Sequence, residues 1–268
     1  MKREILYHLS IFLSCLGLLF LIFDALILLL FGFIITALLY SVYFFVMIIV
    51  LVDCAYLFGR KKTILFFILA FTMGLLMEII GVLYGFPFGK YHYANIPMKI
   101  FNLVPFDIPI YWFVIVYTSM SINNRILNLD KNRKMQLYEI PLIAALDGLC
   151  ATAWDLIMDP VMVHILNVWV WEEKGEFFGI PFSNFLGWTF VAGLISLIFR
   201  SIIKSGGEKM RTTSISGIVY FELWFTMALI AHAAEHPEYI PIGSMLMFTF
   251  LLLFILQTIH RTADNGAL

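Results

Sequence analysis

Charged side chains are scarce in this chain of 268 residues, of which only 13% are charged and 62% are hydrophobic. A typical soluble domain has about 25% charged residues, so the composition excludes an ordinary soluble fold and indicates an integral membrane protein. The formal net charge is −1. Basic residues occur only in short segments between apolar runs, so no nucleic-acid partner is expected.

Cysteine and the common catalytic signatures are also rare. The three cysteines, Cys15, Cys54 and Cys150, lie in apolar runs without the spacing of metal ligands, and we interpret them as core residues. The chain has no G-x-S-x-G, phosphate-binding glycine loop or dinucleotide fingerprint. The Asp-rich boxes of prenyl transferases and the histidine boxes of di-iron desaturases are missing too. Any chemistry must therefore come from isolated polar residues in apolar segments.

Long apolar runs dominate the chain. A membrane-spanning helix needs about 20 apolar residues, and the stretch from Ile5 to Phe58 fits two spans with a turn near Gly32. Six more spans are predicted at Thr63–Tyr84, Val104–Asn123, Leu137–Met158, Phe185–Ile203, Ser214–Ala234 and Ile242–His260. The sequence thus predicts an all-α polytopic membrane helix bundle of about eight transmembrane helices, forming a single integral membrane domain over residues 1–268.

Basic residues predict the orientation of this bundle. With eight spans, three of the 17 Lys and Arg residues, Lys90, Lys99 and Lys174, lie on one side and the remainder lie on the side of the termini. Lys and Arg concentrate on the cytoplasmic side of membrane proteins. We therefore expect both termini to be cytoplasmic, in the plasma membrane of a prokaryote.

Four acidic residues, Glu78, Asp147, Asp155 and Asp159, lie within or at the rim of apolar runs. A carboxyl group in hydrocarbon is costly and indicates a functional site, and desolvation favours its neutral form. The three aspartates follow an i, i+4 row, which places them on one helix face. The alternatives are structural: Asp159 before Pro160 is typical of a helix N-cap, and the other three acids would tie helices together through hydrogen bonds.

Polar and aromatic side chains gather near the outer ends of the predicted spans. Tyr91 and Tyr93 follow the span of Glu78, Trp154 adjoins Asp155, and Asn184 and Trp188 begin a later span. Aromatic faces near carboxyl groups can stabilise a cation. The alternatives are an interfacial aromatic belt, plain packing, and a helix cap at Asn184.

The segment His232-Ala-Ala-Glu235-His236 matches the His-x-x-Glu-His pattern of some zinc enzymes. Pro237 follows directly, and no third ligand is evident. We favour an interfacial histidine cluster and predict no metal site.

Several blocks in the middle of the chain are similar to those of the membrane carotenoid hydratase family, which includes carotenoid 1,2-hydratases and bisanhydrobacterioruberin hydratases. The blocks are Met77–Gly81, Pro87–Tyr93, Val104–Trp112, Thr152–Pro160, Trp169–Trp171 and Asn184–Trp188. They cover under half of the chain, and their order and spacing together carry the resemblance.

The resemblance implies a cofactor-free hydratase that adds water to a terminal isoprenoid C=C bond and forms a tertiary alcohol. The implied partners are the lipid bilayer and a carotenoid or another isoprenoid lipid, such as an unsaturated ether-lipid tail. Such chemistry needs an acid, for which Asp155 and Glu78 are the candidates, and a base that orients water, for which we expect Asp159 with Asn184. Binding of the substrate is expected at Asp147 and at the aromatic residues Tyr91, Tyr93, Trp154 and Trp188.

Two other functions fit the same residues. A proton-coupled transporter or lipid-binding membrane protein would use intramembrane carboxyls to relay protons. A metal-dependent membrane enzyme would use the His-x-x-Glu-His segment.

Overall fold

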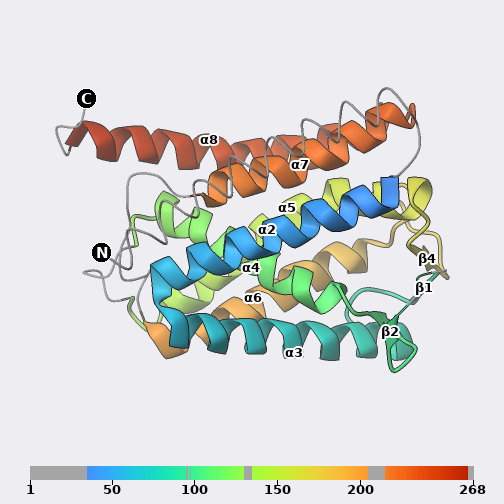
Figure 1. The fold of residues 1–268 in the computed structure, drawn as a ribbon, viewed down its shortest axis with the longest axis horizontal. Helices are drawn as coiled ribbons and strands as arrows, with labels where there is room; N and C mark the ends of the chain where they lie inside the picture. Colours follow the sequence, from blue (N-terminus) through green and yellow to red (C-terminus); the bar gives the residue numbers. More distant parts are fainter. Residues whose placement is uncertain (1–34, 95, 97, 130–134, 205–214, 265–268) are drawn as a thin grey trace.

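The computed structural model describes residues 35–94, 96, 98–129, 135–204 and 215–264 (Figure 1). These residues form mainly helices: α2 (Ile35–Phe58), α3 (Arg60–Tyr84), α4 (Ile108–Ile126), α5 (Glu139–Pro160), α6 (Phe182–Ile203), α7 (Ser216–Ala233) and α8 (Pro241–Asp264). Short helices η1 (Val161–Ile165) and η2 (Pro237–Tyr239) follow α5 and α7. Four short strands, β1 (Tyr91–Tyr93), β2 (Lys99–Ile100), β3 (Val104–Pro105) and β4 (Trp169–Trp171), form two antiparallel pairs.

The helices agree closely with the six later spans expected from the sequence. Among the described residues, α3, α5 with η1, α6, α7 and α8 up to His260 are long and apolar enough to cross a membrane. The apolar segment Val46–Phe58 is shorter, and α4 carries polar residues through its second half. The first predicted span and both termini fall outside the described residues. The count of eight spans and the cytoplasmic termini therefore stay predictions.

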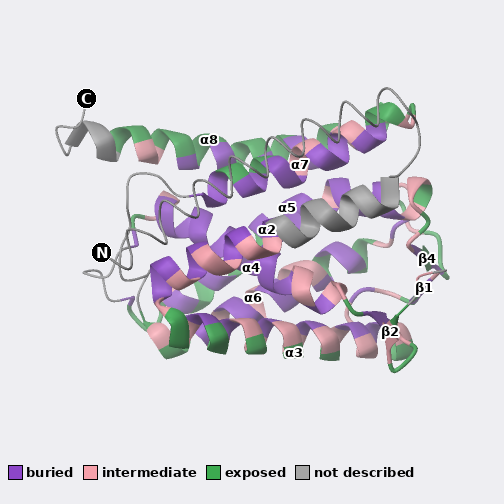
Figure 2. Cartoon of the chain, in the orientation of Figure 1, coloured by how far each residue is buried: buried purple, intermediate pink, exposed green. Residues whose placement is uncertain are grey.

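Helices α4 and α5 occupy the middle of the bundle, with α3 on one side and the α7–α8 pair on the other (Figure 1). Buried residues concentrate in this middle layer (Figure 2). Helix α5 packs tightly on α6 because Gly148 has no side chain: a Cβ atom there would lie 2.3 Å from the Thr189 carbonyl oxygen. Thr152 and Thr189 add a hydroxyl–hydroxyl hydrogen bond of 2.8 Å across the same interface.

Strands β1 and β4 close one end of the bundle. Helix α3 ends at Tyr84 and is capped by Gly85, whose left-handed conformation (φ 77°) is readily adopted by glycine and turns the chain toward β1. Helix α5 runs through Pro160 into the π-helical turn η1 and then into β4. Tyr91 pairs with Trp171 and Tyr93 with Trp169, so the two strands bring the ends of α3 and α5 together.

Candidate active site

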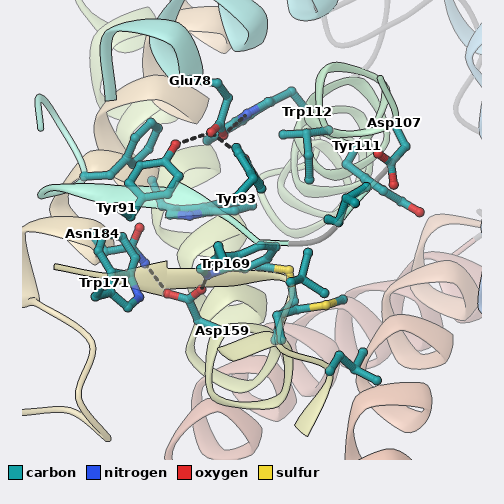
Figure 3. Close-up of a pocket in the computed structure, with 18 of the residues that line it drawn as sticks. Glu78, Tyr91, Tyr93, Asp107, Tyr111, Trp112, Asp159, Trp169, Trp171 and Asn184 are labelled. Carbon is teal, nitrogen blue, oxygen red and sulfur yellow. Dashed lines mark hydrogen bonds between the residues drawn. The ribbon is translucent and has the colours of Figure 1, made fainter. Parts of the chain in front are cut away.

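A cavity of about 500 Å³ lies beneath the β1–β4 pair (Figure 3). Its volume is typical of small-molecule sites. It is lined by seven of the nine site residues expected from the sequence: Glu78, Tyr91, Tyr93, Trp154, Asp159, Asn184 and Trp188. The structure therefore brings together residues from α3, β1, α5 and α6 that are far apart in the sequence.

Glu78 is surrounded by hydrogen-bond donors. Its Oε2 accepts a hydrogen bond from the Tyr91 hydroxyl and another from the Tyr93 hydroxyl, the latter 2.7 Å long. Its Oε1 accepts one from Trp112 Nε1 at 3.0 Å. The Glu78 side chain is buried, and all three partners are neutral. Among the described residues, neutral donors therefore hold the carboxyl in place.

Strand β1 presents both tyrosines to Glu78 because alternate residues of a strand point to the same face. Tyr91 and Tyr93 are buried, whereas His92 between them is exposed. Burial, together with the nearby Glu78 charge, raises the pKa of both phenols well above the usual value. Both hydroxyls therefore keep their protons and remain donors across the physiological pH range.

Asp155 and Asp159 form a pair of carboxyl groups that is bridged by Asn184. The Asn184 amide donates to Asp155 Oδ2 at 2.8 Å and to Asp159 Oδ2 at 2.6 Å. Trp169 Nε1 donates to Asp159 Oδ1 at 2.8 Å. Asp159 lines the cavity, whereas Asp155 lies behind it, and its Oδ1 has no hydrogen-bond partner among the described residues.

Figure 3 shows Glu78 with its donors on one side of the cavity and Asp159 with Trp169 and Asn184 on the other. Glu78, Asp155 and Asp159 are all buried. Like charges in a dry site disfavour full ionisation of such a cluster. The arrangement is therefore suited to hold and transfer a proton.

Tryptophan rings form an apolar wall of the cavity. Trp112 stacks on Trp188 with centroids 4.4 Å apart, and Trp154 meets Trp188 edge-on at 6.0 Å. Gly74 makes room for Trp112, because a Cβ atom at position 74 would lie 2.5 Å from the indole Cδ1. This wall offers several π faces to a developing positive charge.

Asp147 does not line this cavity, although the i, i+4 row suggested that it binds substrate. Its carboxylate pairs with Arg200, whose Nε lies 2.7 Å from Oδ2, and both side chains are fully buried. Asn123 donates to Asp147 Oδ1 at 2.9 Å, and Ser196 donates to Oδ2. Asp147 lies about three turns from Asp159 along α5. Its partners come from α4 and α6, so it connects helices through hydrogen bonds, which was the structural alternative considered from the sequence.

The His232–His236 segment lacks the geometry of a zinc motif. Helix α7 ends at Ala233, so the two histidines do not share a helical face. His236 instead pairs with Glu238 at 2.8 Å and stacks on Tyr239. No group of three or more potential metal ligands occurs within the described ranges.

Sequence reasoning did not assign Trp112, Trp169 or Trp171 to the site. Trp112 and Trp169 donate to the two carboxyl clusters, and Trp171 packs on Tyr91. Their available signal was their place in the blocks Val104–Trp112 and Trp169–Trp171, which carry the family resemblance. Which indole meets which carboxyl depends on the β1–β4 register, which no local pattern specifies.

Comparisons with known proteins place the chain in a family. The family model described as "Carotenoid biosynthesis protein" matches residues 36–252. The chain is also similar to bisanhydrobacterioruberin hydratase of Haloarcula japonica, with 27% identity over 136 residues. That alignment covers 50% of this chain and 44% of the relative, so the chain spans less than half of the relative's length. No solved structure matches the chain. The match over most of its length shows that the chain belongs to the carotenoid biosynthesis protein family.

Proposed function

We propose that this protein is a cofactor-independent hydro-lyase that adds water to a terminal C=C bond of a carotenoid or related isoprenoid lipid. One observation carries the proposal: Glu78 and Asp159 face the same aromatic cavity, and the hydrogen-bond partners described for both are neutral. Family membership and the hydratase relative support it.

Glu78 is the proposed acid. Of the two acids considered from the sequence, Glu78 lines the cavity and Asp155 does not. An alkene is a weak base, so the acid must be strong in its local setting. Three donors, from Tyr91, Tyr93 and Trp112, stabilise the anion that remains after Glu78 gives up its proton. Such preorganised donors lower the barrier where charge develops.

Proton transfer breaks the Glu78 O–H bond, and the π electrons of the alkene form a new C–H bond. A tertiary carbocation results at the more substituted carbon. Trp112, Trp154 and Trp188 line the cavity and present indole rings to this cation. A cation on an aromatic face is stabilised by about 2 kcal/mol or more when water is excluded.

Asp159 is the proposed base. Water held by Asp159 and Asn184 attacks the cation and forms the C–O bond, and its proton passes to the Asp159 carboxylate. Return of that proton to Glu78 restores the resting state, so alkene plus water gives a tertiary alcohol with no net oxidation. Asp155 acts through Asn184, because the shared amide fixes the position of Asp159.

The test is lipid analysis of a host that expresses the chain together with candidate unsaturated isoprenoids. Wild-type protein should yield a product heavier by one water, whereas Glu78→Gln and Asp159→Asn should yield at least about a hundredfold less, as is typical for loss of a general acid or base. Glu173→Gln, at an exposed loop position, is the matched control. Wild-type product levels from Glu78→Gln would refute the assigned acid. Gradient-dependent transport without any hydrated product would identify the transporter alternative instead.

A further inference from the structure

The loop between β1 and α4 carries large apolar side chains on its outer surface. Strands β2 and β3 form a tight hairpin, and Met98, Phe101 and Phe106 on or beside it are 83%, 78% and 55% exposed. The exposed loop is visible below the β2 label in Figure 2. Exposed side chains of this size next to a membrane span indicate a contact with another apolar phase.

The hairpin turn favours this interpretation. Phe101 and Asn102 at its tip have φ angles of 52° and 60°, and the Leu103 amide donates to the Ile100 carbonyl at 3.0 Å. Two central residues with positive φ are typical of a type I′ turn, where Asn and Gly are preferred. A phenylalanine in this conformation is strained. A phenylalanine kept at the tip despite this strain indicates that its side chain makes a contact there.

The hairpin continues the lipid-facing surface of α3. The outer face of this helix bears exposed apolar residues at Ile64, Ile68, Leu76 and Leu83. Phe106 packs edge-on against Phe71 of the same helix, with centroids 6.4 Å apart. The 25 residues of α3 extend about 37 Å, longer than the roughly 30 Å hydrocarbon core. We therefore expect the end of α3 near the interfacial layer, and the contact with Phe71 places Phe106, at the end of the hairpin, alongside the middle of this helix.

The same hairpin borders the mouth of the cavity. Ile96 precedes it and Asp107 follows it, and both line the cavity and are only partly buried. Lys99 ties the hairpin to the site, because its Nζ donates to the carbonyls of Tyr93 and Ala94 at 2.7 and 2.9 Å. Leu166, which is half-buried, and Asn167, which is exposed, also line the cavity.

We propose that the β2–β3 hairpin inserts Met98, Phe101 and Phe106 into the lipid interface and opens the cavity mouth to the bilayer, so that an isoprenoid end enters sideways from lipid. The entry of substrate rests on the proposed function, whereas the insertion does not. A cavity of about 500 Å³ holds the end of a long isoprenoid, so the rest of such a chain must stay outside. A mouth in the lipid interface lets that remainder stay in an apolar medium.

Insertion is tested with nitroxide labels on single cysteines, in a background that replaces Cys15, Cys54 and Cys150 with alanine. The variants Met98→Cys and Phe101→Cys are compared in phosphatidylcholine–phosphatidylglycerol vesicles with Leu83→Cys on the lipid face and Glu173→Cys in an exposed loop. Labels at 98 and 101 should collide with oxygen more than with a water-soluble nickel chelate, as at position 83. Collision ratios equal to that at position 173 would overturn the proposal, whether or not the protein hydrates isoprenoids.

Entry is tested by hydration of a long isoprenoid delivered in the same vesicles. Phe101→Ser together with Met98→Ser should raise KM several-fold, whereas Tyr138→Ser at the opposite end of α5 should not. An unchanged KM in the double variant would overturn lateral entry even if the labels report insertion. Wild-type protein that shows insertion but forms no hydrated product would refute the proposed function and leave the membrane contact standing.

Discussion

The single residue Trp112 makes two different contacts in the site. Its indole N–H donates to Glu78 Oε1 at 3.0 Å, and its ring stacks on Trp188. In the proposed reaction the N–H stabilises the Glu78 anion while the ring faces the cation. The two contributions can be separated, because phenylalanine keeps a ring and loses the donor.

Trp112→Phe should lower kcat by about tenfold to a hundredfold, since a hydrogen bond to a charged group contributes about 1.5–3 kcal/mol. The measurement is the initial rate of hydration in membranes at saturating isoprenoid. Trp224→Phe is the control, because Trp224 donates to Ser244 outside the cavity at 2.6 Å. A wild-type kcat for Trp112→Phe would show that the indole N–H does not assist Glu78.

Gly74→Ala should displace Trp112, because the added methyl group would overlap the indole ring. Loss of hydration together with a lowered thermal midpoint is the expected result, since overpacking a filled site costs about 1–3 kcal/mol. Both are measured on the purified protein in detergent. Full activity in this variant would contradict the assigned position of Trp112.

Among the secondary-structure elements, strand β1 positions side chains on both sides of the site. Its inward residues Tyr91 and Tyr93 hold Glu78, and its pairing with β4 brings Trp169 over Asp159. Tyr93→Phe should therefore slow hydration by about tenfold, as expected for one lost donor to a charged group. His92→Ala, on the outward face of the same strand, should leave the rate unchanged. Equal effects of the two substitutions would indicate that the strand matters only for packing.

The raised pKa of Tyr91 and Tyr93 also predicts a pH response. A phenol donates only while protonated, and a pKa raised above its usual value of about 10 keeps the proton at higher pH. The pH–rate profile should therefore show no decline from these tyrosines between about pH 7 and pH 10. A basic limb in this range that disappears in Tyr93→Phe would contradict the burial of the phenol.

The stability of the whole molecule is expected to depend on the buried ion pair of Asp147 and Arg200, which lies outside the cavity. Breaking a buried ion pair costs about 3–5 kcal/mol because it leaves one charge unpaired. Arg200→Met should therefore lower the thermal midpoint strongly. The double variant Arg200→Met with Asp147→Leu should recover part of that loss, since two apolar residues can replace a buried pair. A double variant less stable than Arg200→Met would contradict this account.

Sequence patterns predicted the helices well because an apolar run of about 20 residues has few alternatives in lipid. They also located the acidic residues that line or adjoin the cavity, since a carboxyl in such a run is conspicuous. They could not predict the partners: Asp147 meets an arginine 53 residues away, and Tyr93 meets Glu78 through a strand paired across the bundle end. Pro237, directly after the His232–His236 segment, spoke against one helix through both histidines, and α7 does end at Ala233.

The most direct test of the central claim is hydration of an unsaturated isoprenoid by the purified protein in vesicles prepared in water labelled with heavy oxygen. Mass spectrometry should detect a tertiary alcohol with one labelled oxygen from wild-type protein, and about a hundredfold less from Glu78→Gln. An unlabelled product, no product from wild-type protein, or equal labelled product from Glu78→Gln would contradict acid-catalysed hydration at this cavity.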